Sequence, residues 1–174
     1  LVLPPTVLGF YLLIMLNPES AVGSLWVELT GDSLTFSFSG LIISSIIYSL
    51  PFMVQPLQAG FRAVPESVLE SAATLGASPR DRWLNVVLPM AKRGYLTGCV
   101  LTFAHTVGEF GVVLMMGGNI PGETRVLSIA IYEHVETLNY DAAHMLALGL
   151  LCFSFLSLWL VYRYAGHRFE VVRG

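Results

Sequence analysis

The feature that most constrains the fold is a polar interval, residues 62–93, that lies between two long apolar segments. Residues 33–61 contain no charged side chain, and residues 94–116 are apolar apart from His105 and Glu109. A helix of about 20 apolar residues crosses a bilayer, so each segment is long enough to span one. The polar interval is therefore predicted to be a loop that connects two transmembrane helices.

The composition indicates a membrane protein rather than a soluble domain. Hydrophobic residues make up 55% of the chain and charged residues 12%, about half the charged fraction that is usual in soluble domains. Two further apolar segments, 1–18 and 142–162, bring the predicted spans to four. We therefore expect an all-α membrane protein, a bundle of transmembrane helices that forms a single domain over residues 1–174.

Prolines are expected to distort two of the predicted spans, and the first residues of the chain indicate that it starts within a span. Pro4 and Pro5 are expected to break any simple helix in the first segment, and Pro51 and Pro56 to kink or break the second. The chain begins inside a hydrophobic segment, without Met or a charged flank, which is not the pattern of a signal peptide. We expect an N-terminally truncated chain that lacks at least one upstream span.

The positive charges predict the orientation in the membrane. Five of the nine Lys and Arg residues lie in 62–93, and three lie in the C-terminal tail, Arg163, Arg168 and Arg173. Lys and Arg accumulate on the cytoplasmic side, so residues 62–93 and the C-terminus are predicted to be cytoplasmic. The acidic loops 19–32 and 117–141 then share the opposite side. No basic patch of the kind that binds nucleic acid is present.

Within the polar interval, the pattern predicts two short helices with a turn between them. Pro65 suits the first position of one helix, and Gly76 is typical of a helix end. Ser78 is a predicted N-cap for the second helix, with Pro79 in its first turn, and Pro89 is expected to interrupt the helical path beyond it.

The first of these helices has a shallow apolar face. Ala72, Ala73 and Gly76 leave little bulk, so another surface can approach the backbone closely, as in a helix that docks into a partner's groove. The alternative is a cytoplasmic loop folded against its own membrane helices.

The spacing of six residues in this interval resembles a known motif. Glu70, Ala72 and Gly76 are followed by Val86, Leu88 and Pro89, which is similar to the EAA loop of ABC importer permeases. That family has Ala where this chain has Ser71 and Ile where it has Val86, and both exchanges keep the side chain small or branched. The segments 3–13, 48–58 and 104–136 resemble the molybdate permeases of that family in particular.

This resemblance implies a fold, a function and partners. The fold would be that of a type I ABC importer permease, usually with five or six spans, and the function translocation of molybdate across the bacterial or archaeal cytoplasmic membrane. The partners would be a second permease copy in a homodimer, two copies of an ATP-binding subunit that use ATP and Mg, and a periplasmic or extracellular molybdate-binding protein. This chain would bind no cofactor and would not itself be an enzyme.

The resemblance also assigns roles to residues. Residues 62–93 would be the cytoplasmic coupling loop, and its contacts with the ATPase would come from Glu70, Ala72, Ala73, Gly76, Leu88 and Pro89. Tungstate, or sulfate and thiosulfate, are alternative solutes, because all are similar oxyanions and an external binding protein would discriminate among them.

His105 and Glu109 lie four residues apart in the third predicted span. An ionisable group at membrane depth usually faces a cavity or a partner. Glu109 is therefore either part of the wall of a translocation path or a buried carboxyl group that is hydrogen-bonded to a neighbouring helix, with His105 as one possible intermediary. Gly108 and Gly111 beside it would let another helix pack closely.

Hydroxyl groups are the other candidates for the path. Ser45 and Thr106 are neutral donors that can contact an oxyanion without holding it tightly, although most hydroxyls of the second span are expected to serve helix packing. A proton-coupled secondary transporter, with His105 and Glu109 as the relay, is the alternative of another class. A membrane-embedded enzyme built on the same two residues lacks a nucleophile or a metal set.

Nucleotide and metal binding are not indicated. Residues 117–124 have the glycine spacing of a phosphate-binding loop, but Glu123 stands where the essential lysine belongs, and its charge would repel a phosphate. His134 and His144 have no third ligand near them in the sequence, so no metal site is predicted.

Overall fold

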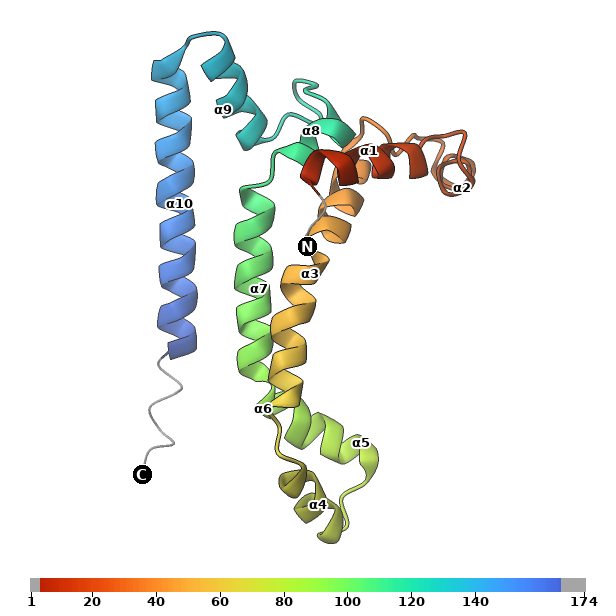
Figure 1. The fold of residues 1–174 in the computed structure, drawn as a ribbon, viewed down its shortest axis with the longest axis vertical. Helices are drawn as coiled ribbons and strands as arrows, with labels where there is room; N and C mark the ends of the chain where they lie inside the picture. The colour runs from red at the N-terminus through yellow and green to blue at the C-terminus, as the bar shows by residue number, and fades with distance from the viewer. Residues whose placement is uncertain (1–3, 167–174) are drawn as a thin grey trace. The chain divides into compact units, whose positions relative to one another are not determined.

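In the computed structural model, which describes residues 4–166, every regular element is a helix (Figure 1). This confirms the all-α prediction. The chain divides into two compact units. Unit 1 comprises Leu1–Ser49 and Thr106–Tyr162, and unit 2 comprises Leu50–His105 and Arg163–Gly174.

Unit 1 is organised around the contact between α1 and α8. It contains α1 (Pro5–Met15), α2 (Ala21–Thr30), the first half of α3 (Phe38–Arg62), α8 (Gly111–Gly117), α9 (Leu127–Glu136) and most of α10 (Tyr140–Gly166). A side chain at Gly9 would place its Cβ 2.9 Å from Cβ of Met115, so only glycine allows α1 to lie this close to α8. The buried apolar side chains of the unit are Leu12, Leu16, Leu34, Leu41, Val112, Val113, Met116 and Ile129.

The first predicted span differs from the expectation. Pro4 and Pro5 do not break a helix but begin one: Pro4 is the residue before α1, and Pro5 occupies its first position. Proline is favoured there because the first amide of a helix has no partner within the helix. The resulting helix has 11 residues. That length reaches roughly half the thickness of the hydrocarbon core at 1.5 Å per residue.

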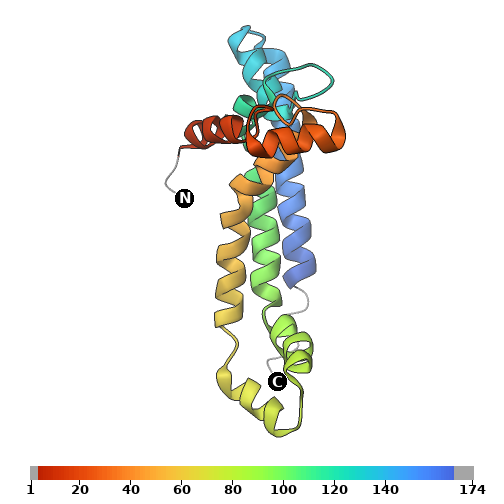
Figure 2. The same cartoon turned by 90° about the vertical axis from the view of Figure 1, so that its right-hand side faces the viewer.

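Unit 2 consists of the second half of α3, the polar interval and most of α7 (Lys92–Val107). The polar interval contains α4 (Glu66–Thr74), α5 (Pro79–Arg82), the π-helix η1 (Trp83–Val87) and α6 (Leu88–Met90). Figure 2 shows α3 and α7 side by side. A Cβ at Gly94 of α7 would lie 2.8 Å from Cα of Gly60 in α3, so the two backbones meet at a pair of glycines.

The prolines of α3 do not break it. Pro51 and Pro56 both lie inside one helix that runs from Phe38 to Arg62. Neighbouring helices can shelter the carbonyl groups that a proline leaves without an amide partner. The packing of α7 against this half of α3, which includes a stacked contact of His105 on Phe52 with ring centroids 3.8 Å apart, is consistent with that shelter.

The structure gives fewer spans than the four predicted. Among the described residues, α3 and residues 140–160 of α10 are long and apolar enough to cross a membrane, and α7 with α8 forms a third candidate that is bent by 60°. The first segment is too short, and the third is interrupted at residues 108–110. Arg168 and Arg173, on which the predicted orientation partly depends, lie outside the described residues, and the orientation stays a prediction.

Candidate functional site: the 62–93 loop and the helix break at Glu109

The C-terminal end of α4 is a Schellman motif built on Gly76. The amide of Gly76 donates to the carbonyl of Ala73 at 2.9 Å, and the amide of Ala77 donates to the carbonyl of Ala72 at 3.0 Å. These bonds require a left-handed backbone, and Gly76 has φ of +86°. The prediction that Gly76 ends this helix is confirmed. The chain therefore turns sharply at the point where the two short helices meet.

The start of α5 also agrees with the prediction. The Ser78 hydroxyl accepts a hydrogen bond from the Asp81 amide at 3.2 Å, and Pro79 takes the first helical position. At α4 the assignment shifts by one residue, because Pro65 precedes the helix and Glu66 is its first residue. Local bonds therefore set the C-terminal end of α4 and the N-terminal end of α5.

Pro89 lies inside a helical path from Pro79 to Met90, formed by α5, η1 and α6, and the path is interrupted at Ala91, two residues after the proline. Residues 83–87 form a π-helical segment directly before Leu88, whose amide donates to the carbonyl of Trp83. A proline removes one amide and crowds the carbonyl four residues earlier, here that of Asn85. The wider π turn leaves room for that carbonyl, so the proline is accommodated inside the helical path.

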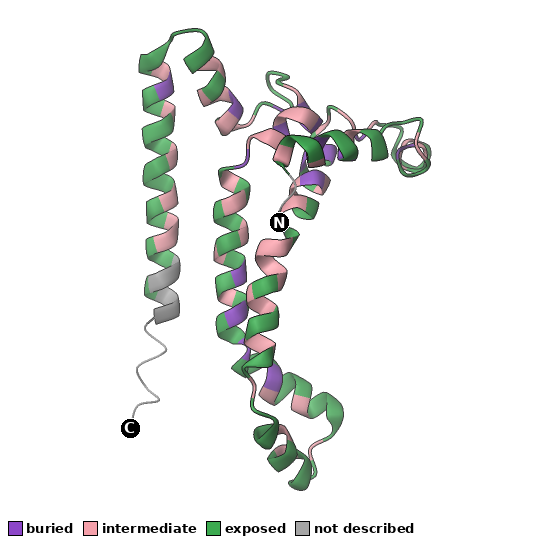
Figure 3. Ribbon diagram, in the orientation of Figure 1, coloured by how far each residue is buried: buried purple, intermediate pink, exposed green. Residues whose placement is uncertain are grey.

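The helix α4 has no buried residue, and Figure 3 shows it almost entirely as exposed. Leu75, next to Gly76, is 87% exposed. Ala73 and Gly76 are exposed and Ala72 is half-buried, so the small-residue face is open over most of its area. An apolar side chain displayed at a helix end beside small residues is the shape that inserts into a groove of another protein.

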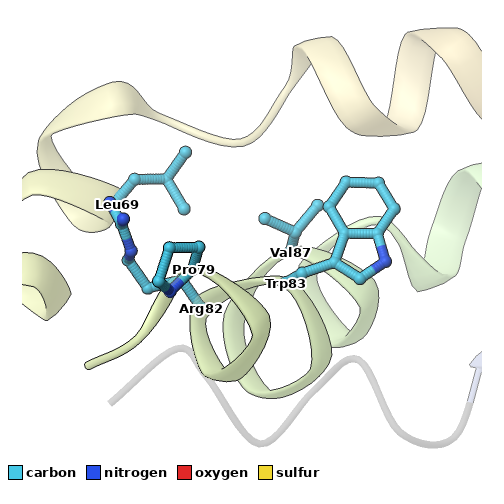
Figure 4. Close-up of a pocket in the computed structure, with 5 residues that line it drawn as sticks. All are labelled: Leu69, Pro79, Arg82, Trp83 and Val87. Atoms are coloured by element: carbon cyan, nitrogen blue, oxygen red, sulfur yellow. The ribbon is translucent and has the colours of Figure 1, made fainter.

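A hollow of about 200 Å³ separates α4 from the helical stretch after it. Leu69 lines it from α4, and Figure 4 shows that side chain across the hollow from Trp83 and Val87, with Pro79 and Arg82 between them. The Nε atom of Arg82 is buried and has no hydrogen-bond partner among the described residues.

In unit 1, Glu109 lies at the break between α7 and α8. Its side chain is 6% exposed, and its Oε1 accepts a hydrogen bond from the Val112 amide in the first turn of α8 at 2.8 Å. The Tyr48 hydroxyl of α3 also bonds to this carboxylate. The Ser128 hydroxyl of α9 donates to the main-chain carbonyl of Glu109 at 2.7 Å. Glu109 is thus linked to α3, α8 and α9.

A hydrogen bond from His105 to the Glu109 carboxylate stays a prediction. Helix α7 ends at Val107, so the two residues are not on one continuous helix and a four-residue spacing does not put them on one face. The hydrogen-bonded neighbour of the Glu109 carboxylate in another helix is Tyr48. His105 stacks on Phe52 in unit 2.

The two hydroxyl candidates lie near this break. The Thr106 hydroxyl is 2.8 Å from that of Ser49, which is buried, so this pair ties the end of α7 to α3. Ser45 is half-buried and lies one helical turn before Ser49, on the same face of α3. Ser44, in contrast, is buried and bonds back to the carbonyl of Gly40 at 2.7 Å, as expected for a packing residue.

Residues 117–124, which have the glycine spacing of a phosphate-binding loop, are hydrogen-bonded to one another. The buried Thr124 hydroxyl donates to the carbonyl of Gly117 at 2.5 Å and accepts from the amide of Ile120 at 3.2 Å. Arg125 pairs with Glu133 at 3.2 Å, and Asn119 bridges the same two side chains. The threonine that suggested a nucleotide loop is thus a structural element of the turn between α8 and α9.

Comparison with known proteins identifies the family. The model for the binding-protein-dependent transport system inner membrane component matches residues 1–167. The chain belongs to this family.

Individual relatives in the family carry more specific names. The molybdenum transport system permease protein ModB of Azotobacter vinelandii is 54% identical over 93% of this chain and 72% of its own length. A putative molybdenum transport system permease protein, YvgM of Bacillus subtilis, is 32% identical over 96% of this chain and 74% of its own length. A probable sulfate transport system permease protein, cysT of Chlorella vulgaris, is 30% identical over 97% of this chain and 63% of its own length.

The sequence did not predict the burial of Arg82 or the contacts of Glu109. The sequence marks Arg82 only as a positive charge, although its Nε is buried beside the loop hollow. No pattern links Tyr48 and Ser128 to Glu109, because they lie on α3 and α9, far from it in the sequence. The only sequence signal for such a meeting was the pair Gly108 and Gly111, and α1 does approach Gly111, with Pro5 at 2.9 Å from a Cβ placed there.

Proposed function

We propose that this chain is the permease subunit of an ATP-driven importer that carries molybdate across the cytoplasmic membrane. The observation that carries the proposal is the 54% identity to a molybdenum transport permease, against 30% to a sulfate permease, over nearly the whole chain. The apolar helices α3 and α10 and the bent α7–α8 pair would supply the membrane-embedded part.

Residues 62–93 are proposed to be the cytoplasmic loop that couples the permease to a separate ATP-binding subunit. The contacts would come from Glu70, Ala72, Ala73 and Gly76 on and after α4, with Leu88 and Pro89 at the far end of the loop. Leu75 would fill an apolar pocket of that partner, and burying a leucine stabilises a complex by roughly 1.5–3 kcal/mol.

The working unit would contain two copies of this chain, two ATP-binding subunits and an external molybdate-binding protein. ATP and Mg would bind to the ATP-binding subunits, and their closure would draw the two loops together. A loop that transmits such a movement must be rigid, and the capped helices on either side of Gly76 support that role. Ser45 and Thr106 are proposed to border the translocation path, whereas Glu109, the third candidate from the sequence, is buried.

Reconstitution tests this proposal. The chain, in its full-length natural form, is placed in liposomes with the ATP-binding subunit and the binding protein, and uptake of molybdate, tungstate and sulfate is measured with and without ATP. We expect ATP-dependent uptake of molybdate that exceeds that of sulfate. Uptake driven by a proton gradient in vesicles that lack the ATP-binding subunit would instead support the secondary transporter.

Labelling tests the orientation. A cysteine at Ala72 or Trp83 should react with a membrane-impermeant thiol reagent only when the inner face is open to it. Cys99 and Cys152 are exposed in the structure and are first replaced by serine, so that the reaction reports one position. Labelling of Ala72→Cys from outside intact cells would overturn the proposed position of the loop.

A further inference from the structure

We infer that Glu109 is a positioning residue: its carboxylate fixes the break between α7 and α8 and does not contact the transported anion. The inference rests on the proposed transport function and chooses between the two roles that the sequence left open for Glu109, a wall of the path or a buried, hydrogen-bonded carboxyl group. It follows from the hydrogen bonds at Glu109, from its burial and from the packing of α8.

The Glu109 carboxylate is already bonded to protein groups. One oxygen accepts the Val112 amide at 2.8 Å, and the Tyr48 hydroxyl is also bonded to the group. The amides in the first turn of a helix have no hydrogen-bond partner within that helix. An acidic side chain can accept a hydrogen bond from one of them, and its position near the positive end of the helix dipole is stabilising. Glu109 is thus committed to protein partners in the conformation described.

Solvent and solute have little access to Glu109. The side chain is 6% exposed, and the Ser128 hydroxyl holds its main-chain carbonyl from α9. On the other side, α1 closes over the start of α8, where a Cβ at Gly111 would lie 2.9 Å from Pro5. A carboxyl group that is enclosed in this way and bonded to protein groups leaves no open face to an oxyanion.

The break at residues 108–110 sets the direction of α8. The helices α7 and α8 are bent by 60° across residues 108–110, and α8 has only seven residues. So short a helix has little stability of its own and depends on contacts that hold its ends. Glu109 holds the first turn of α8 through the Val112 amide, and Gly9 allows α1 to pack along the helix. The direction of α8, and with it the wall near Thr106, should therefore depend on this carboxylate.

The test uses the complete transporter complex and three variants. Glu109→Gln keeps an oxygen that can accept the Val112 amide, Glu109→Leu keeps the volume but no acceptor, and Glu28→Gln removes an exposed carboxylate of α2 as a matched control. Initial uptake rates are measured over a range of molybdate concentrations. Hydrogen exchange is measured in the peptide that covers residues 109–117.

If Glu109 is a positioning residue, the variants should differ in maximal uptake rate and in hydrogen exchange. Glu109→Leu should lower the maximal rate about tenfold, with an unchanged half-saturating concentration, and should speed exchange in 109–117. Glu109→Gln should stay within about threefold of the natural protein in rate and should keep slow exchange. Tyr48→Phe combined with Glu109→Leu should cost less than the sum of the two single effects, because both remove the same bond.

Two results would overturn the inference. One is a Glu109→Gln variant as impaired as Glu109→Leu, with exchange unchanged in both, which would point to the charge itself. The other is a shift of the half-saturating concentration in Glu109→Gln, which would indicate contact with the anion. If the natural complex transports none of the three oxyanions, the proposed function fails, but the exchange experiment still decides whether Glu109 holds α8.

Discussion

Substitution of Gly76 by tryptophan offers the sharpest test of the coupling loop, because the structure separates two ways in which it can do harm. Gly76 has φ of +86°, and a Cβ placed there meets no atom of the chain within 4 Å. An L-residue forced into this conformation costs roughly 1–2 kcal/mol, whatever its size. Within the chain, therefore, Gly76→Ala and Gly76→Trp should be about equally destabilised.

Gly31 supplies a matched control. It ends α2 with φ of +81°, and a Cβ placed there also meets no atom within 4 Å. Gly31→Trp therefore carries the same backbone strain and the same added bulk in the other unit. If the surface around Gly76 docks against the ATP-binding subunit, only Gly76→Trp adds bulk at that interface. Gly76→Asn, a residue that tolerates the left-handed region, tests bulk with less strain.

The assay is retention of the ATP-binding subunit on the purified permease, followed by transport. We expect Gly76→Trp to lose the subunit and to abolish uptake while it inserts normally in the membrane. Gly76→Ala should weaken retention by roughly 5–30-fold at most, the factor that corresponds to the strain. Normal uptake by Gly76→Trp would refute docking at this surface, and equal loss of the subunit in Gly31→Trp would show that backbone strain is the cause.

Two further predictions concern packing in each unit. Gly94→Ala would place a Cβ 2.8 Å from Cα of Gly60, so it should destabilise unit 2 by about 1–3 kcal/mol and lower the thermal unfolding midpoint in detergent. Gly149→Ala on α10 meets no neighbouring atom and should be neutral or slightly stabilising; equal effects of the two substitutions would contradict the close contact of α3 with α7. Thr124→Val removes a buried hydroxyl that bonds to Gly117 and Ile120, and should cost about 1–3 kcal/mol in the same unfolding measurement. Thr124→Ser should retain most of that stability, and a valine variant as stable as the natural protein would show that the hydroxyl bonds contribute little.

Local signals in the sequence were sufficient for the polar interval. Gly76 ends α4 and Ser78 caps α5 as predicted, because both depend on bonds between residues a few positions apart. The prolines were less well predicted. Pro5 begins a helix, Pro51 and Pro56 lie inside one, and Pro89 is accommodated by a π turn. A proline forbids one hydrogen bond, but the surrounding helix and its neighbours decide whether the helix ends, continues or widens.

The sequence by itself determined the class of the protein and the positions where α4 ends and α5 begins, because composition and capping depend on residues that are close together in the chain. Only the tertiary structure decided that α7 ends before Glu109 and that this carboxylate meets Tyr48 and the start of α8. Those contacts join helices that are distant in the chain, and the energy of burying a charged group depends on such partners rather than on the residues beside it.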